Sequence, residues 1–600
     1  MIPRDAKHQT LKDVFGFDAF RPGQEAAMDA LLAGRNVLTV MPTGSGKSLC
    51  YQVPALVLGG LSIVVSPLVA LMQDQVSALR LAGVAADSIN SSQPREENVA
   101  AWRRAATGQT RLLYLAPERL MTERMLEALA RLDVRLIAVD EAHCISQWGP
   151  AFRPEYEALS RLRELFPRVP IVALTATADE VTRADIAARL FDGEAEMIVL
   201  GFDRPNIKLA VEAKQDGKKQ LLAFLGRHRG ASGIVYCLSR KKTEDTAAFL
   251  TGHGIRALAY HAGMDKEQRD ANQNAFMTEP AIVMVATIAF GMGIDKSDVR
   301  FVFHADLPGS LEAYYQEIGR AGRDGASAEA HMLFGLADIR MRRMFIDNEN
   351  AGDDRKRREH QRLNALLAYC EAPSCRRRLL LGYFGEQAEP CGNCDLCLEP
   401  GTLADGTADA CAVLAVMRQT GERYGAVHIV DVLRGQQNEK VLSAGHDRIA
   451  AFGAGAGRKR EEWQTLIRQM VGAGLLHLDV AGYGGLAITD KGRALAAGGG
   501  TFRYRPHVAR KTDRKERPAA APLDGDDDSL LTALKTLRMR LAKQRRVPAY
   551  VIFSDRTLTD MAQRRPQTDA EFAEVNGVGA KKLKEFGVVF LSAIRDAAAA

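Results

Sequence analysis

The run Asn36-Val-Leu-Thr-Val-Met-Pro-Thr-Gly-Ser-Gly-Lys-Ser48 joins a short apolar strand to a glycine-containing loop, and a helical segment is expected directly after it. Gly44 and Gly46 let backbone amides approach phosphate oxygens, and the amino end of the following helix adds its dipole. The sequence therefore predicts a phosphate-binding loop between a strand and a helix.

The polar side chains of this loop suit a nucleoside triphosphate. Lys47 supplies a positive charge to the β- and γ-phosphates, and the Ser48 hydroxyl can bind Mg²⁺. The strict pattern begins with Gly, whereas this chain has Met41 there. A plain glycine-rich turn is the alternative, which the strand and helix on either side disfavour. The candidate nucleotide-binding residues of the loop are Thr43, Gly44, Ser45, Gly46, Lys47 and Ser48.

A second apolar run, Val134–Val139, ends in two acidic residues. Asp140 is placed to complete a Mg²⁺ shell, and Glu141 to orient and deprotonate an attacking water. An acidic surface turn is the alternative. His143 follows two residues later. It either relays the nucleotide state to other parts of the protein or simply caps a turn.

Far along the chain, the run Gln316-Glu-Ile-Gly-Arg-Ala-Gly-Arg-Asp324 carries Arg320 and Arg323. Such arginines can neutralise charge that develops on a γ-phosphate. Arginines on an ordinary helix surface are the alternative. Together with the loop, they predict hydrolysis that is coupled to closure of a cleft between two domains.

Short apolar runs alternate with helical stretches in the first third of the chain, and the pattern restarts after Phe202-Asp-Arg-Pro-Asn206. Continuous apolar strands between helices indicate parallel sheets that are covered on both faces. We therefore predict two α/β domains in tandem, at residues 1–201 and 202–335, with a ligand cleft between them.

The remaining chain changes character several times. Residues 336–402 combine charged helices with cysteines, and residues 403–509 combine helices with a glycine-turned hairpin, which suggests a winged helix. Residues 510–528 contain almost nothing to bury and are expected to form a flexible linker. Residues 529–600 are periodic enough for a small helical bundle.

Four of the nine cysteines follow the spacing Cys375-x15-Cys391-x2-Cys394-x2-Cys397. Four thiolates suit a tetrahedral structural Zn²⁺, and a reducing compartment explains the cluster better than scattered disulfides do. Cys370 competes with Cys375 as the fourth ligand, and an iron–sulfur cluster is the alternative metal centre.

The net charge of +6 is too small to identify a nucleic-acid binder. Basic residues do cluster at Arg503–Arg517 and Lys535–Arg546, which fits phosphate contacts or solvated faces. No run approaches the roughly 20 apolar residues of a membrane span, and the amino terminus has no apolar signal region. We expect no membrane contact and a cytoplasmic location.

Three further runs carry a family resemblance: Phe15-Gly-Phe-Asp-Ala-Phe-Arg-Pro-Gly-Gln24, Asp140-Glu-Ala-His-Cys-Ile-Ser-Gln-Trp-Gly149 with Phe152-Arg-Pro-Glu155, and Ala289-Phe-Gly-Met-Gly-Ile-Asp-Lys296. With the motifs above, they resemble a superfamily-two helicase core and, more closely, the RecQ family of DNA helicases. The resemblance extends through essentially the whole chain. It implies two RecA-like domains, a zinc-binding module, a winged helix and a helicase-and-RNaseD C-terminal (HRDC) domain.

The resemblance also implies an activity: an ATP- and Mg²⁺-driven DNA helicase that moves 3′ to 5′ in recombination, repair and replication. In this family Gln24 would bond the adenine edge, while Arg21 and Phe17 stack on its faces. Relatives often carry Tyr at the position of Phe17, so stacking survives here but a hydroxyl hydrogen bond does not. Gln316 is added to the expected nucleotide-binding residues.

The family resemblance places single-strand contacts on an aromatic-rich loop with Trp148, Phe152 and Arg153, because aromatic faces stack on bases of any sequence. Burial between domains is their alternative role. Tyr550 is a further candidate for single-strand contact, or else part of the bundle core. The expected partners are single-stranded and duplex DNA and, through the winged helix, single-strand DNA-binding protein, with a nucleoid-associated location.

Two other functions remain open from the sequence. One is an RNA helicase or remodelling ATPase, against which the winged helix and the terminal bundle argue. The other is a zinc-containing DNA-binding regulator with an inactive ATPase. The presence of Lys47, Glu141, Arg320 and Arg323 together argues against that regulator.

Overall fold

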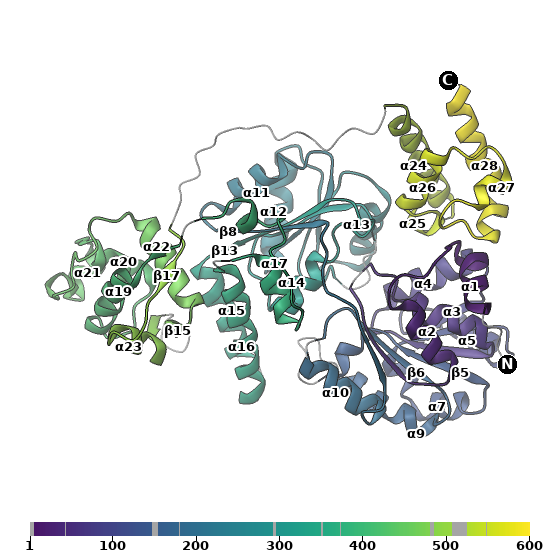
Figure 1. The fold of residues 1–600 in the computed structure, drawn as a ribbon, viewed down its shortest axis with the longest axis horizontal. Coiled ribbons are helices and arrows are strands. Elements are labelled where there is room, and N and C mark those ends of the chain that lie inside the picture. Colours follow the sequence, from purple (N-terminus) through teal and green to yellow (C-terminus); the bar gives the residue numbers. More distant parts are fainter. Residues whose placement is uncertain are drawn as a thin grey trace.

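Two α/β lobes, a helical module, a winged helix and a terminal helical bundle make up this protein (Figure 1). The structure is a computed structural model. It describes residues 5–42, 44–146, 154–178, 180–291, 296–349, 352–372, 374–401, 403–479, 485–506, 525–545, 547 and 549–599.

The first lobe is a parallel seven-stranded sheet in the order β3-β4-β2-β5-β6-β1-β7. Its strands are β1 (Val37–Val40), β2 (Leu61–Val65), β3 (Ala86–Ile89), β4 (Leu112–Leu115), β5 (Val134–Val139), β6 (Ile171–Thr175) and β7 (Glu196–Val199). All four residues of β1 are buried, as expected for a strand inside a sheet that is covered on both faces. The register pairs Val40 with Thr175, which sets the phosphate loop beside the end of β6.

The described helices of this lobe either precede β1, as the first three do, or lie between successive strands. They are α1 (Ala6–Thr10), η1 (Leu11–Phe15), α2 (Gln24–Leu32), α3 (Leu49–Leu58), α4 (Val69–Leu81), α5 (Arg95–Ala106), α6 (Pro117–Leu120), α7 (Glu123–Leu129), η2 (Ala142–Ile145), α8 (Pro154–Glu157), η3 (Ala158–Arg161), α9 (Leu162–Leu165) and α10 (Glu180–Phe191).

The second lobe is a parallel six-stranded sheet in the order β10-β11-β9-β12-β13-β8. Its strands are β8 (Ile207–Ala213), β9 (Ser232–Tyr236), β10 (Ala257–Tyr260), β11 (Val283–Ala286), β12 (Val299–His304) and β13 (Ala328–Phe334). Its helices are α11 (Gly217–Leu225), α12 (Arg240–Gly252), α13 (Lys266–Thr278) and α14 (Leu311–Ile318). The predicted pair of tandem parallel-sheet domains is therefore confirmed.

A helical module follows the second lobe and packs against β8. Its helices are α15 (Leu336–Asn348), α16 (Asp353–Cys370), α17 (Arg376–Tyr383) and α18 (Asp395–Leu398). The winged helix comes next, with β14 (Ala404–Asp405), α19 (Thr407–Gln419), α20 (Ala426–Leu433), α21 (Glu439–Ser443), η4 (His446–Arg448), α22 (Arg460–Gly472), β15 (Leu476–Asp479), β16 (Gly485–Ile488), α23 (Asp490–Ala496) and β17 (Arg503–Tyr504).

The hairpin and the helix face that the sequence predicted in the winged helix are both present. Strands β15 and β16 pair antiparallel, from Leu476 opposite Ile488 to Asp479 opposite Gly485. The predicted apolar face of α22 is buried, and it consists of Trp463, Leu466, Ile467, Met470 and Val471. The helix period thus identified its core side correctly.

The terminal bundle consists of α24 (Gly525–Arg545), α25 (Ala549–Ile552), α26 (Asp555–Arg564), α27 (Asp569–Ala573) and α28 (Ala580–Ala599). The expected linker at 510–528 lies mostly outside the described residues, and its end needs correction because α24 already begins at Gly525. Negative charge is favourable at the amino end of a helix, so an acid-rich run can begin one as well as form a tether.

The bundle packs on η1 and α4 of the first lobe and also meets α13 of the second (Figure 1). The amide of Gly577 donates to the carbonyl of Gly16 over 2.7 Å, and Lys581 Nζ donates to the carbonyl of Arg80 over 2.8 Å. Gly16 has a φ of +73°, and a Cβ there would lie 2.5 Å from the backbone of Val578. Only glycine allows the two backbones to approach so closely at this position. Among the described residues, no helix has both the length and the apolar character that crossing a membrane requires.

Candidate active site

The phosphate loop leaves β1 and enters α3, as its sequence predicts. Gly44 and Gly46 have φ angles of +85° and +81°, which glycine adopts without steric cost. The amide of Met41 donates to the carbonyl of Thr175 over 3.0 Å and so ties the start of the loop to the end of β6. Thr43 lies outside the described residues.

The segment expected to read adenine bonds this loop directly. Gln24 is buried, and its Nε2 donates to the carbonyls of Ser45 and Gly46 over 3.1 and 3.0 Å. Arg21 Nη1 donates to the carbonyl of Gly44 over 2.6 Å. Gln24 therefore holds the loop and also lines the cavity beside it, and its contact with adenine stays a prediction. Phe17 lines the cavity that lies beside the phosphate loop.

The two acids stand at the end of β5, within reach of positive charge from both lobes. Burial and the Glu141 carboxylate raise the pKa of Asp140. Burial also acts to raise the pKa of Glu141, but the charges of Lys47, His143, Arg320 and Arg323 outweigh it and lower that pKa. Glu141 is thus held as the ionised carboxylate that a base needs.

Glu141 also has an unusual backbone conformation. Its φ is +50°, a left-handed value that costs energy for a residue with a side chain. The fold holds it in place, because the amide of Glu141 donates to Asp140 Oδ1 over 2.9 Å and Tyr156 donates to the carbonyl of Asp140 over 3.1 Å. Such strain is typical of residues whose direction matters to a site.

The arginine segment of the second lobe reaches this pocket. Ser310 caps the amino end of α14, where its side chain accepts a hydrogen bond from the amide of Ala313, and the two arginines follow the end of the helix. A Cβ on Gly44 would lie 3.6 Å from Cγ of Arg323, so that arginine packs against the phosphate loop. Arg320 is buried and donates to the carbonyl of Gly291. Both lobes therefore contribute to one pocket.

A chain of polar contacts joins Glu141 to the second lobe. Gln316 Nε2 on α14 donates to Thr177 Oγ1 over 2.7 Å and lies 3.5 Å from His143 Nε2. His143 Nδ1 lies 2.9 Å from Thr175 Oγ1 and 3.3 Å from Glu141 Oε2. Gln316, which was predicted to bind nucleotide, therefore bridges the two lobes.

The pocket is a cavity of about 850 Å³. Its walls come from both lobes and, unexpectedly, from the terminal bundle through Arg556, Asn576 and Lys582. Burial lowers the pKa of Lys582 to about 8. Sequence reasoning gave these three residues no role at the pocket. Nothing local in the sequence indicates which distant segment a tethered bundle will cover.

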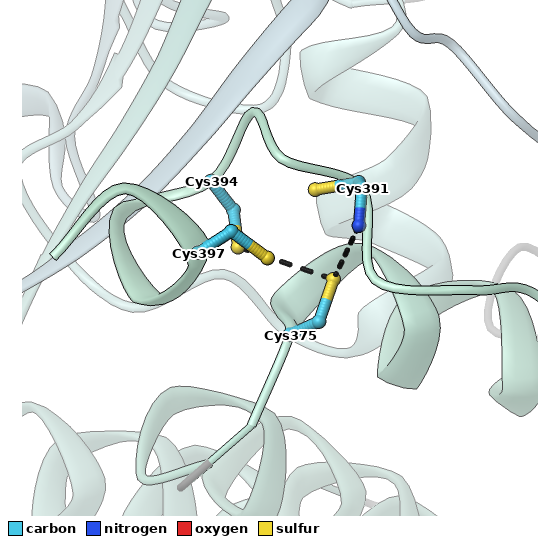
Figure 2. Close-up of side chains that lie close together, drawn as sticks. All are labelled: Cys375, Cys391, Cys394 and Cys397. Carbon is cyan, nitrogen blue, oxygen red and sulfur yellow. Dashed lines mark hydrogen bonds between the residues drawn. The ribbon is translucent and has the colours of Figure 1, made fainter. Parts of the chain in front are cut away.

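The four predicted zinc ligands converge from the residue before α17, the loop that leads into α18, and α18 itself (Figure 2). The Sγ atoms of Cys375, Cys391, Cys394 and Cys397 all lie within 4.8 Å of one another. Sγ of Cys394 lies 4.0 Å from that of Cys375, close to the spacing of about 3.8 Å that Zn–S bonds of about 2.3 Å give a tetrahedral site. The geometry therefore fits one zinc ion.

The thiols of this cluster differ: burial raises the pKa values of Cys391 and Cys397, whereas the pKa of Cys375 is lowered. Burial of Cys375 favours the neutral thiol, but the amides of Arg378 and Cys391 donate to its Sγ and lower its pKa to about 7. Cys370 is a separate, buried cysteine at the end of α16, and burial raises its pKa far above the usual range. The geometry thus brings Cys375, and not Cys370, to the other three thiols.

Four side chains were predicted to contact DNA. Trp148, Phe152 and Arg153 are outside the described residues. Tyr550 belongs to α25, but its side chain is outside them too. Their roles stay predictions.

Two parallel-sheet lobes that share one phosphate pocket define a two-lobed helicase ATPase. The family models for DEAD/DEAH box helicases and for the helicase conserved C-terminal domain match residues 21–185 and 216–325. Models for RecQ zinc-binding, the RQC domain and the HRDC domain match residues 336–398, 400–513 and 527–594. The chain belongs to the RecQ family of DNA helicases. Its cofactors are ATP and Mg²⁺, with structural zinc in the cysteine cluster.

Curated relatives match this chain over nearly its whole length. The ATP-dependent DNA helicase RecQ of Haemophilus influenzae is 41% identical over 99% of this chain and 97% of its own. The proteins of the same name from Pasteurella multocida and Bacillus subtilis are 42% and 36% identical, over 98% of this chain in both cases and over 93% and 98% of their own.

If the bond between Gln316 and Thr177 carries the coupling between lobes, Gln316→Ala and Thr177→Val should each lower kcat for ATP about tenfold, the scale of one buried hydrogen bond. Because both changes break the same bond, the double variant should be no slower than either single one. Steady-state ATPase assays with single-stranded DNA measure this. Effects that multiply in the double variant would show that the two residues act separately.

Replacing Cys394 by Ala should abolish stoichiometric zinc binding and lower Tm, because metal binding contributes directly to the folding of such modules. The matched control Cys370→Ala should keep one zinc ion per chain. Metal analysis by mass spectrometry and thermal melting provide the readouts. Zinc loss in Cys370→Ala, or iron in the wild-type protein, would contradict the assignment.

Proposed function

We propose that this protein is an ATP-driven motor that moves 3′ to 5′ along one DNA strand and unwinds the duplex ahead of it, in recombination, repair and replication. One observation carries the proposal: Arg323 of the second lobe packs against Gly44 in the phosphate loop of the first. A site completed by two lobes can convert hydrolysis into movement of one lobe against the other.

Each residue of the pocket has a proposed task. The positively charged ammonium group of Lys47 binds the β- and γ-phosphates, and Ser48 and Asp140 would hold Mg²⁺. When bound, Mg²⁺ would supply charge neutralisation at the phosphates. Glu141 orients the attacking water and accepts its proton.

The two arginines complete the chemistry from the second lobe. Arg320 and Arg323 neutralise the charge that develops on the γ-phosphate, so hydrolysis is fastest when the cleft is closed. Loss of the γ-phosphate removes the charge that holds them and lets the cleft reopen. Gln316 contacts Thr177 and His143, and through them it transmits the loss of the γ-phosphate to the two acids at the end of β5.

DNA contacts are proposed on three parts of the chain. Trp148, Phe152 and Arg153 sense single-stranded DNA, because stacking on bases needs no particular sequence. The β15–β16 hairpin of the winged helix separates base pairs, and Tyr550 of the terminal bundle adds weak single-strand contacts. Such a motor acts on chromosomal DNA, so we propose that the protein is located in the cytoplasm at the nucleoid.

Strand separation on tailed duplexes tests this proposal. A duplex with a 3′ single-stranded tail should be unwound in the presence of ATP and Mg²⁺, whereas one with a 5′ tail should not. Lys47→Ala should abolish both hydrolysis and unwinding, because the phosphate charge is then unmatched. Preference for the 5′ tail would overturn the polarity, and stronger stimulation of ATPase by RNA than by DNA would favour an RNA helicase.

We also propose that the winged helix binds single-strand DNA-binding protein. Support comes from two exposed apolar side chains, Val427 on α20 (56% exposed) and Leu442 on α21 (48%). Burial of such side chains in an interface contributes about 1.5–3 kcal/mol each. Replacing both by Ser should therefore weaken binding at least about tenfold by fluorescence anisotropy. Val588→Ser, on the exposed face of α28, is the matched control, and equal affinity of both variants would refute this surface.

A further inference from the structure

The chain passes from one lobe to the other through residues 201–206, which we call the hinge. The amide of Phe202 donates to Glu386 Oε2 over 2.6 Å, and its carbonyl accepts a hydrogen bond from the Tyr315 hydroxyl over 2.8 Å. Its ring stacks on that of Phe384 with centroids 4.5 Å apart. The hinge is therefore held by the zinc-binding module on one side and by α14 on the other.

The zinc-binding module holds the hinge through further contacts. Arg377 pairs with Asp203 at 3.2 Å. Asn393 Nδ2 donates to the carbonyl of Pro205 over 3.0 Å, and Asn393 lies in the sequence between the zinc ligands Cys391 and Cys394. The loop that binds zinc is thus bonded directly to hinge backbone.

The same hinge holds the loop that carries the arginines. Arg204 donates to the carbonyls of Gly319, Ala321 and Gly322 over 3.3, 3.0 and 2.9 Å. Asn206 Nδ2 donates to the carbonyl of Gly322 over 2.9 Å, and a Cβ on Gly322 would lie 2.4 Å from that nitrogen. The backbone on both sides of Arg320 is therefore fixed to the hinge with little room to shift.

We propose that Glu386 is a positioning residue for ATP hydrolysis: by holding the hinge amide of Phe202, it fixes Arg204 and, through Arg204, the arginine loop. The zinc-binding module thereby sets how the second lobe presents its arginines to the phosphate pocket. The inference rests on the proposed ATPase. The zinc-binding module then has a role in closure of the cleft as well as a structural one, although none of its described residues lines the pocket.

Kinetics separate this role from simple stabilisation. Glu386→Ala should lower kcat for DNA-stimulated ATPase about tenfold and leave KM for ATP within about twofold, because the loop that grips the phosphates belongs to the other lobe. Glu386→Gln should recover most of kcat, since its carboxamide oxygen still accepts the amide hydrogen. Glu389→Ala, an exposed glutamate of the same segment, is the matched control and should behave as wild type.

Zinc content and Tm are measured on every variant. If kcat per folded, zinc-loaded molecule is unchanged in Glu386→Ala, the residue is merely structural and the proposal fails. If Arg204→Ala and Glu386→Ala act through one path, the double variant should lose less than the product of the single effects. Fully multiplied losses would overturn that path.

Closure of the two lobes can be measured without ATP hydrolysis. Fluorophores introduced through unnatural amino acids at the exposed positions Arg103 and Asp245 report the distance between the lobes by energy transfer. With a non-hydrolysable ATP analogue and single-stranded DNA, Glu386→Ala should keep a larger open population than wild type or Glu389→Ala. Identical distributions would refute the proposal. Absence of DNA-stimulated turnover in the wild-type protein would instead count against the proposed function itself.

Discussion

The contact between Arg323 and the phosphate loop at Gly44 is the interaction on which the rest of this protein depends. Neither lobe has a complete pocket, since the first carries the loop and the acids and the second carries the arginines. A triphosphate bound between them can draw the lobes together, because its negative charge faces cations from both sides.

The electrostatics of the pocket follow from burial. Two carboxylates at the end of β5 cannot both remain charged in a buried site without nearby cations, and burial alone acts to raise both pKa values. Lys47 supplies a cation from the same lobe, and the arginines supply two from the other. These cations, together with His143, lower the pKa of Glu141 and favour its ionised form.

The remaining domains act on this pocket from outside. The zinc-binding module bonds the hinge through Glu386 and Asn393, and the terminal bundle adds Lys582 to the cavity wall. Both contacts join segments that are far apart in sequence. The cysteine cluster is thus linked to the proposed hinge between the lobes, because the loop that carries its cysteines bonds the carbonyl of Pro205.

The sequence by itself determined whatever depends on neighbouring residues: the strand, loop and helix around Lys47, the acids after β5, the four thiols and the apolar face of α22. Short-range backbone geometry and residue chemistry fix these locally. Only the tertiary structure decided that Gln316 bonds Thr177, that Gln24 holds the phosphate loop and that Glu386 grips the hinge. These contacts depend on how separately folded parts pack against one another, and no local pattern of residues encodes such long-range packing.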